Sequence, residues 1–231
     1  MKPLKLYYPF KPFRVTQKFA ENNACSNPDG TGVVSALPNG TCPSGKVKLY
    51  PLLGMKGHTG LDLYAPDGSI LRAPHDGVVK ELSLEPERGL GVGIVTHEKV
   101  DMGVHGIHFA KTRQWHGKKI LVEFNQVVKT GDPIMLADNT GLSAGSHNHF
   151  ELKPIKYTDN GGQKNIYQDN GYFGSIDPTQ FFTGLYAENS HIVPKASDSI
   201  DSFAAKLEAQ GNTTAAKQMR ALATVLRAFG H

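Results

Sequence analysis

The chain of 231 residues has no long apolar run. No window approaches the roughly 20 consecutive apolar residues that a membrane-spanning helix needs. Residues 1–13 (MKPLKLYYPFKPF) carry lysines, but prolines interrupt them and no apolar core of a signal peptide follows. We therefore expect no membrane insertion and no export through a cleaved signal peptide.

An excess of charge of one sign is also missing. Lysine and arginine number 25, and aspartate and glutamate number 21, so the formal net charge is only +4. No run of lysine and arginine occurs, and such runs are typical of nucleic-acid-binding segments. We therefore expect no nucleic-acid partner. A mildly basic surface suits an anionic bacterial envelope, and it suits an ordinary soluble surface equally well.

Cysteine is scarce, with two residues, Cys25 and Cys42. Both lie in a polar stretch rich in glycine, asparagine and proline, which we interpret as a loop insertion at 22–46. A disulfide would close this loop and stabilise it by about 3 kcal/mol in the chain-entropy model. Two free thiols or zinc ligands are the alternatives, although no CxxC pair supports a cysteine-only zinc site. We favour the disulfide for a protein that works outside a reducing cytosol.

Glycine (25 residues) and proline (14 residues) are plentiful, which favours turns and strands over long helices. Short candidate strands follow one another between turn motifs, and their succession predicts a mainly β fold with a central antiparallel sheet rather than a βαβ fold. The expected strands are Val47–Tyr50, Leu61–Tyr64, Ser69–Ala73, Gly77–Leu84, Gly91–His97, His105–His116, Lys119–Phe124, Pro133–Ala137 and His147–Leu152.

The two ends of the chain differ from this pattern. The prolines of residues 1–21 exclude a helix, so we expect an extended arm there. After Pro194 the apolar spacing becomes helical, with a break at Gly211 and a cap at Asn212. We therefore divide the chain into a main domain at 1–184 and a linker with a C-terminal helical hairpin at 185–231. The apolar face of the hairpin would dock to the main domain or to a partner protein. Its first helix contains Ile200, Phe203 and Leu207, and its second contains Ala216, Met219, Ala223, Leu226 and Phe229.

Two histidines of the last strand, His147 and His149, point to a metal site. Side chains at i and i+2 of a strand lie on the same face, so both can reach one ion. A catalytic zinc takes three protein ligands and keeps one position open, so this pair is too few. Upstream, His58 and Asp62 stand four residues apart around Gly60 and can also meet at one point. Either pair alone could arise by chance, but the two pairs together indicate a metal site.

Five motifs in a fixed order resemble those of the M23 metallopeptidases, the lysostaphin/LytM-type peptidoglycan endopeptidases. The resemblance covers residues 14–152, and the amino-acid sequences of some motifs are similar to versions found in bacteriophage proteins. The motifs are GHTGLDL at Gly57–Leu63, APHDGVV at Ala73–Val79, WH at Trp115–His116, VVKTGDPI at Val127–Ile134 and DNTGLSAGSHNHF at Asp138–Phe150.

This resemblance implies a zinc endopeptidase that cuts bacterial peptidoglycan, with an open groove above its central antiparallel sheet. It implies that His58, Asp62 and His149 bind one Zn²⁺ ion and that His116 and His147 are the catalytic histidines. Zinc lowers the pKa of a bound water to about 7 and polarises a peptide carbonyl. A neutral histidine can accept a proton, and a protonated one can steady the oxyanion. The sequence does not assign these two roles between His116 and His147.

Two positions depart from the family, which usually has leucine where this chain has Asn148 and Gly117. Neither position is a ligand.

Two alternative hypotheses for the function remain. One is a catalytically silent, virion-associated binding or structural module, and the other is a zinc peptidase of free proteins. We expect action at the bacterial cell wall. Without a signal peptide, carriage on a phage virion or release by lysis would bring the protein there, and a lost leader would explain the sequence equally well.

The remaining histidines have ordinary structural explanations. We expect His75, His97 and His105 to be solvated or hydrogen-bonded at turns and strand ends. His108 shares a strand face with His116 but lies eight residues away, which is about 26 Å along a strand. None of these four is therefore expected in the site.

Overall fold

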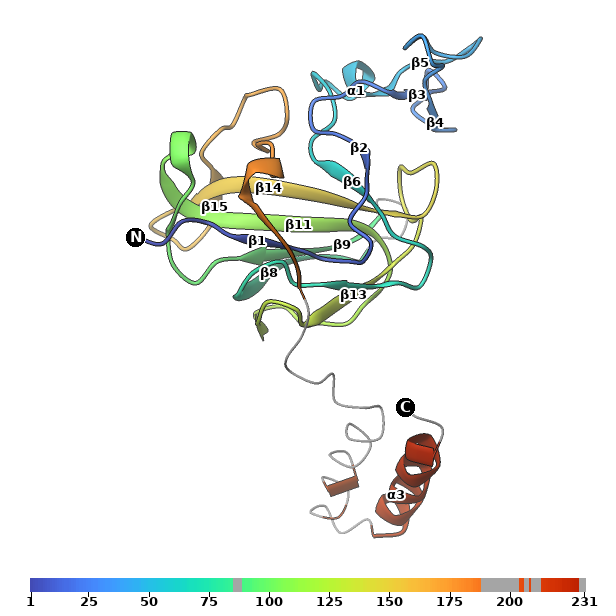
Figure 1. The fold of residues 1–231 in the computed structure, drawn as a ribbon, viewed down its shortest axis with the longest axis vertical. Helices are drawn as coiled ribbons and strands as arrows, with labels where there is room; N and C mark the ends of the chain where they lie inside the picture. The colour runs from blue at the N-terminus through green and yellow to red at the C-terminus, as the bar shows by residue number, and fades with distance from the viewer. Residues whose placement is uncertain (85–88, 188–203, 206–207, 209–212, 229–231) are drawn as a thin grey trace. The chain divides into compact units, whose positions relative to one another are not determined.

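A computed structural model describes residues 1–84, 89–187, 204–205, 208 and 213–228. The chain separates into two compact units, Met1–Glu188 and Asn189–His231. The first unit consists mainly of strands, which confirms the predicted fold class (Figure 1). Over the described residues, no helix has both the length and the hydropathy that crossing a bilayer requires.

The first unit is built on a sheet of 11 strands, whose main path has the order β12-β8-β9-β11-β14-β6-β2. All the pairings in this sheet are antiparallel. The strands are β2 (Val15–Gln17), β6 (Leu61–Tyr64), β7 (Ile70–Arg72), β8 (Gly77–Ser83), β9 (Leu90–Val95), β10 (Val100–Asp101), β11 (Ile107–Ile120), β12 (Val127–Val128), β13 (Pro133–Ala137), β14 (His147–Tyr157) and β15 (Gln163–Asn165).

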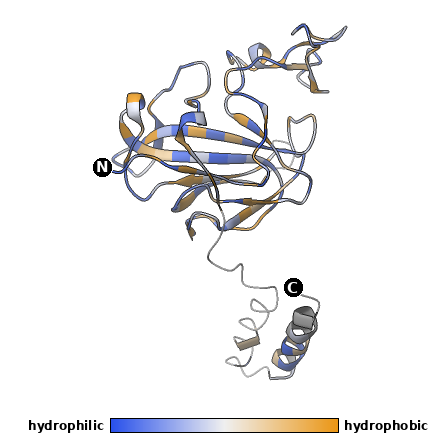
Figure 2. Ribbon diagram, viewed as in Figure 1, coloured by the Kyte–Doolittle hydropathy of each residue, from blue (hydrophilic) through white to orange (hydrophobic). Residues whose placement is uncertain are grey.

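The two longest strands, β11 and β14, pair at the centre of this sheet and carry both polar and apolar residues (Figure 2). Both strands are longer than predicted. β14 continues beyond Leu152 to Tyr157, and β11 continues through Gly117 to Ile120. The prediction of a separate strand at Lys119–Phe124 is therefore wrong. Around Gly117, β11 changes from pairing with β14 to pairing with β13, so one strand continues through this position to Ile120.

Two apolar clusters form the core around the sheet. One joins strands β7, β8, β9 and β13 through buried residues such as Leu71, Val79 and Ile134. The other joins β6 and β14 to the N-terminal arm through residues such as Leu6 and Phe150. Burial of these side chains fixes the strands that carry the histidines, because each buried aliphatic or aromatic side chain contributes about 1.5–3 kcal/mol.

The N-terminal arm is more regular than expected. Besides β2, it contains β1 (Leu6–Tyr8), which pairs in parallel with β16 (Phe182–Tyr186) in a separate two-stranded sheet. β16 crosses residue 184, where we placed the end of the main domain, because its pairing with β1 ties it to the first unit. The division into a main domain and a linker with a C-terminal helical hairpin stays a prediction. Two short 3-10 helices, η1 (Gly103–His105) and η2 (Thr179–Phe181), complete the connections.

The insertion at 22–46 is not a plain loop. It contributes to a three-stranded sheet of order β4-β3-β5, made of β3 (Ala24–Ser26), β4 (Val34–Ser35) and β5 (Val47–Lys48). The strand predicted at Val47–Tyr50 ends early, and the helical turn α1 (Leu49–Leu52) follows. Pro51 explains this change, since proline lacks the N–H that a strand ladder needs and fits the first turn of a helix.

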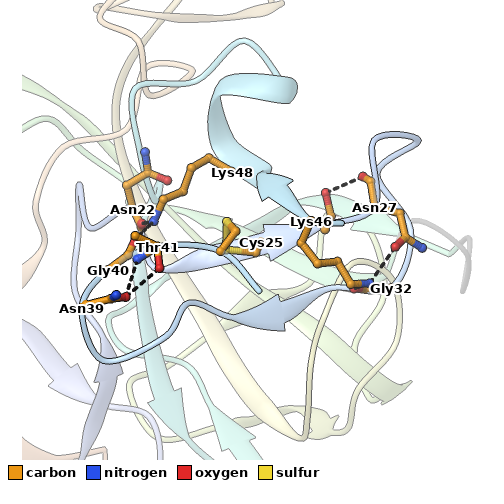
Figure 3. The surroundings of a disulfide bond; sticks show 11 residues. Asn22, Cys25, Asn27, Gly32, Asn39, Gly40, Thr41, Lys46 and Lys48 are labelled. Atoms are coloured by element: carbon orange, nitrogen blue, oxygen red, sulfur yellow. Dashed lines mark hydrogen bonds between the residues drawn. A yellow bond between two sulfur atoms is a disulfide. The ribbon is translucent and has the colours of Figure 1, made fainter. Parts of the chain in front are cut away.

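A disulfide between Cys25 and Cys42 holds this insertion together, with 5.7 Å between the two Cα atoms. Two lysines reinforce it from either side of the bond (Figure 3). Lys48 Nζ donates to the carbonyl of Gly40 at 2.6 Å, and Lys46 Nζ donates to Asn27 Oδ1 at 2.7 Å. These covalent and polar links add to a small apolar cluster of Ala24, Leu49 and Tyr50, against which Val33 packs.

The second unit contains the helix α3 (Thr213–Ala228), which matches the second helix of the predicted hairpin. Within this unit, Arg220 forms an ion pair with Glu208 at 2.7 Å. Ala204, Ala205 and Glu208 are helical, but the rest of the first predicted helix, its apolar residues and the cap at Asn212 lie outside the described residues, as does Phe229. Docking of the hairpin remains a prediction.

Candidate metal centre

Strands β6 and β14 bring the predicted ligands together. Their antiparallel register pairs His149 directly with Asp62. His58 precedes β6, where backbone hydrogen bonds of His58 with Ala20 and Glu21 hold it against the N-terminal arm. Gly60 makes the close approach to β14 feasible, because a Cβ atom at this position would overlap with the carbonyl of Phe150.

Three ligand atoms converge at this point. His58 Nε2 and His149 Nδ1 lie 2.8 Å apart, and each lies 3.0 Å from Asp62 Oδ1. A tetrahedral zinc ion with bonds of about 2.0 Å sets its ligand atoms about 3.3 Å apart. Small outward movements would therefore let the three atoms bind one ion, and they are the metal-ligating group that the described residues offer.

The hydrogen bonds on the outer side of each ring show that this donor set fits a cation. His58 Nδ1 donates to the carbonyl of Lys18 at 3.0 Å, and His149 Nε2 faces Thr59 Oγ1 at 3.3 Å. A neutral imidazole has one N–H, so both inner nitrogens present lone pairs. Two lone pairs and a carboxylate oxygen repel one another unless a proton or a metal ion lies between them. Two imidazole nitrogens and one carboxylate oxygen form a typical set for catalytic zinc.

The electrostatics of the cluster also favour a bound cation. Burial disfavours the charged form of Asp62, but hydrogen bonds from His147, His149 and His58 outweigh burial and hold its pKa well below the usual range. Burial also lowers the pKa of His149, yet the carboxylates of Asp62 and Glu151 outweigh this effect and raise its pKa to about 9. The site therefore attracts positive charge.

The two predicted catalytic histidines lie beside the ligands. His147 shares a strand face with His149, and its Nε2 lies 3.3 Å from Asp62 Oδ1. His116 is contributed by β11, and its ring centre lies 4.7 Å from that of His147. Both rings are anchored at Nδ1, which donates to the carbonyl of Thr140 from His116 and to that of Gly145 from His147. Each ring therefore presents an unprotonated Nε2 when neutral.

His116 occupies a strained backbone position. Its φ of 68° lies in the left-handed region, which is uncommon for a residue other than glycine. Burial, together with the neighbouring His147 and His149, lowers the pKa of His116 to about 3. The departure at Gly117 has a packing reason, because a Cβ atom there would overlap with the side chain of Met135. His116 is thus held neutral near pH 7.

One cavity of about 590 Å³ contains all five predicted site residues. The structure brings these residues together, and their individual roles stay predictions. The insertion forms part of the cavity wall through Val33 and Val34, and the α1 region adds Tyr50 and Leu53. The sequence did not predict this wall. The one available signal for it was the cysteine pair, which stands beside the N-terminal arm.

Tyr50 and Thr59 are also cavity residues that sequence analysis did not select. Tyr50 accepts a hydrogen bond from Gln17 Nε2 at 2.8 Å, and burial raises the pKa of its hydroxyl. Thr59 and Glu151 lie behind His149, and Glu151 is only 5% exposed. A polar side chain two residues beyond His149 on the same strand face is the signal that could have revealed Glu151.

Asn148, on the other face of β14, is fully buried. Its Nδ2 donates to Gln114 Oε1 at 2.9 Å, and Gln114 in turn donates to the carbonyl of Arg72. The Asn148 Oδ1 atom has no hydrogen-bond partner in the structure. An amide pair therefore occupies the place where the family usually has an apolar residue.

Among the described residues, His75, His97, His105 and His108 lie outside this cavity. His75 is buried and hydrogen-bonded, with Nε2 2.9 Å from Thr112 Oγ1 and Nδ1 2.8 Å from the Asp76 carbonyl. Burial lowers the pKa of His75 to about 4. His105 contacts the Tyr167 hydroxyl at 3.2 Å. These contacts agree with the structural roles expected for both histidines.

A comparison with protein families identifies the domain that holds this site. The profile of peptidase family M23 matches residues 56–166, a range that includes all five site residues. Residues 56–166 are a peptidase family M23 domain. The predicted family resemblance is therefore confirmed. The similarity to bacteriophage versions stays a prediction.

Individual relatives agree with this assignment. The chain is similar to the peptidoglycan DD-endopeptidase ShyB of Vibrio cholerae, with 36% identity over 95 residues, or 41% of this chain and 20% of that protein. An uncharacterized metalloprotease of Haemophilus influenzae is 33% identical over 104 residues, or 45% of this chain and 20% of that protein. The chain thus spans about a fifth of the length of these curated relatives.

Among solved structures, the catalytic domain of lysostaphin from Staphylococcus simulans aligns with a TM-score of 0.41 and 20% identity. The alignment covers 55% of this chain and 79% of that domain.

Proposed function

We propose that this chain is a zinc-dependent endopeptidase that hydrolyses peptide bonds in bacterial peptidoglycan. The observation that carries the proposal is the convergence of His58 Nε2, Asp62 Oδ1 and His149 Nδ1 within 2.8–3.0 Å of one another. Membership of family M23 supports the reaction class, and the similarity to a peptidoglycan DD-endopeptidase supports the substrate class.

The ion would be held by His58, Asp62 and His149. A bound zinc ion supplies Lewis acidity, which polarises a peptide carbonyl and lowers the pKa of a water molecule to about 7. His116 is one candidate for proton transfer, because its Nδ1 is already committed to the Thr140 carbonyl and its Nε2 is left available. His147 lies beside His116, with 4.7 Å between the ring centres, and is the second candidate for proton transfer and oxyanion stabilisation.

The cavity suits an extended peptide. It is open to solvent, has a volume of about 590 Å³ and is lined by the loop 142–146 on one side and by the insertion and α1 region on another. Arg113 stacks on Trp115 at 4.3 Å on the β11 side of the cavity. A peptide lying between these walls would place one carbonyl beside the ligand cluster, while its neighbouring residues contact the walls.

Turbidity of purified cell-wall suspensions tests the proposal. We expect the zinc-loaded chain to clear them, a chelator to stop clearing and His147→Ala to abolish clearing while the protein still binds zinc. His108→Ala, which changes a histidine outside the cavity, is the matched control. Full clearing by His147→Ala would refute the role of this residue.

Zinc stoichiometry and digestion of casein-like proteins, measured beside wall clearing, separate the alternative functions. A binding or structural module would hold one equivalent of zinc and hydrolyse no type of wall. A peptidase of free proteins would digest casein-like substrates and leave peptidoglycan intact.

We also propose that the protein acts at the bacterial cell wall, reached on a phage virion or after lysis. The Cys25–Cys42 disulfide supports action outside a reducing cytosol.

A further inference from the structure

A buried chain of polar groups lies behind His149, on the side away from the ligand cluster. β14 places His149 and Glu151 on the same face, and Thr59 approaches both from the segment before β6. Thr59 Oγ1 lies 3.3 Å from His149 Nε2 and 2.7 Å from Glu151 Oε1. Thr59 and Glu151 are both buried, at 7% and 5% exposure, so water does not compete strongly for these bonds.

Positive groups hold Glu151 in place as a carboxylate. Arg113 Nη1 donates to Glu151 Oε2 at 2.6 Å, and Lys153 Nζ lies 3.5 Å from the same oxygen. Arg113 is fixed in turn by Glu81, which accepts hydrogen bonds from Arg113 Nε and Nη2. This arrangement leaves Glu151 Oε1 facing Thr59 Oγ1 at 2.7 Å, with His149 Nε2 3.5 Å from the same oxygen.

The direction of each hydrogen bond in this chain is determined. A carboxylate only accepts, so Thr59 must donate its hydroxyl hydrogen to Glu151. The lone pairs of the Thr59 oxygen then face His149 Nε2, which must carry a hydrogen to interact favourably. With its hydrogen on Nε2, a neutral His149 presents a lone pair on Nδ1, the nitrogen that lies among the candidate ligand atoms.

We propose that Glu151, acting through Thr59, is a positioning residue that fixes the tautomer and ring orientation of His149 for metal binding. This inference rests on the proposed zinc site, and it assigns a role to two residues outside the ligand set and the catalytic pair. Partners of this kind behind a metal-bound histidine typically contribute 10–100-fold to metal affinity.

Zinc affinity of the full chain, measured by competition with a chromogenic chelator, tests the proposal. Thr59→Val keeps the shape of the side chain but removes the hydroxyl, and we expect it to weaken zinc binding about 10–100-fold. Thr59→Ser restores the hydroxyl and should bind zinc within a few-fold of the wild type. Thr112→Val is the control, because it removes another buried threonine hydroxyl, which contacts His75 instead of the site.

A spectroscopic measurement separates positioning from simple destabilisation. In the zinc-loaded wild type, nitrogen-15 shifts of His149 should show a protonated Nε2 and a metal-bound Nδ1, and Thr59→Val should lose this uniform state. Metal-free Thr59→Val and Thr112→Val should unfold cooperatively at similar temperatures.

Three results would overturn the proposal. These are wild-type affinity in Thr59→Val, equal losses in the valine and serine variants, or metal bound at Nε2. Failure of the wild type to bind zinc would instead refute the proposed function, and this inference with it.

Discussion

The buried amide pair Asn148–Gln114 gives a quantitative test of how the strand between the two site histidines is packed. Gln114 is 1% exposed, and its Oε1 accepts the one hydrogen bond that the structure gives the Asn148 side chain. Gln114→Leu would leave the whole Asn148 amide buried without a partner. A buried polar group without a partner costs about 1–3 kcal/mol, so we expect the free energy of unfolding to fall by about 2 kcal/mol.

Asn148→Leu, added to Gln114→Leu, should recover part of this loss. The double variant removes both amides, including the Asn148 Oδ1 atom that already lacks a partner. Replacing both members of a buried polar pair by apolar groups of similar shape is nearly neutral or stabilising. We therefore expect the double variant to be about 1–2 kcal/mol more stable than Gln114→Leu alone, and the two changes to be non-additive by a similar amount.

Urea unfolding followed by the fluorescence of Trp115, the single tryptophan of the chain, provides the assay. Wild type, both single variants and the double variant are compared at one zinc concentration, so that metal binding contributes equally to each midpoint. Additivity within 0.5 kcal/mol, or a double variant less stable than Gln114→Leu, would refute the view that the two amides stabilise each other.

Two further predictions concern Gly60 and His75. Gly60→Ala should weaken zinc binding at least tenfold and destabilise the fold by about 1–3 kcal/mol, because its methyl group would overlap with the Phe150 carbonyl and displace His58. Gly145→Ala, where a Cβ atom meets nothing within 4 Å, should change neither property, and equal effects in an unfolding and zinc titration would count against this reasoning. His75 has a folded-state pKa of about 4, below its ordinary value of 6.5, so the unfolded chain binds the proton first. Stability from this residue is therefore complete above pH 6.5 and falls by about 3 kcal/mol towards pH 4. His75→Gln should flatten this part of the curve in urea unfolding at several pH values, and an unchanged slope would contradict the assignment.

The sequence predicted the components of the site better than their surroundings. His147 and His149 were selectable from strand alternation, and His58 and Asp62 from their short spacing. His116 was selectable only through the resemblance of its Trp115-His116 motif to the M23 family. The strands that carry them were predicted at nearly the right places, since turn residues mark their ends. These signals are local, so a single chain reveals them.

The features that were missed depend on contacts between distant segments. β11 extends beyond His116 because its register shifts at Gly117 and it finds a new partner in β13. The insertion forms a cavity wall because a disulfide and two lysines shape it, and no local pattern encodes that placement. Thr59 and Glu151 meet behind His149 across 92 positions of sequence. Long-range pairing of this kind leaves no periodic signal.

Mass spectrometry of fragments released from purified peptidoglycan tests the central claim, zinc-dependent cleavage of peptide bonds, most directly. Walls of several peptide chemotypes are incubated with the zinc-loaded chain, with the chain after chelation and with the chelated chain after zinc is restored. We predict fragments with newly formed peptide amine and carboxylate ends from at least one chemotype, their loss on chelation and their return with zinc. Fragments that form equally without zinc, or an absence of peptide cleavage in every wall type, would contradict the account.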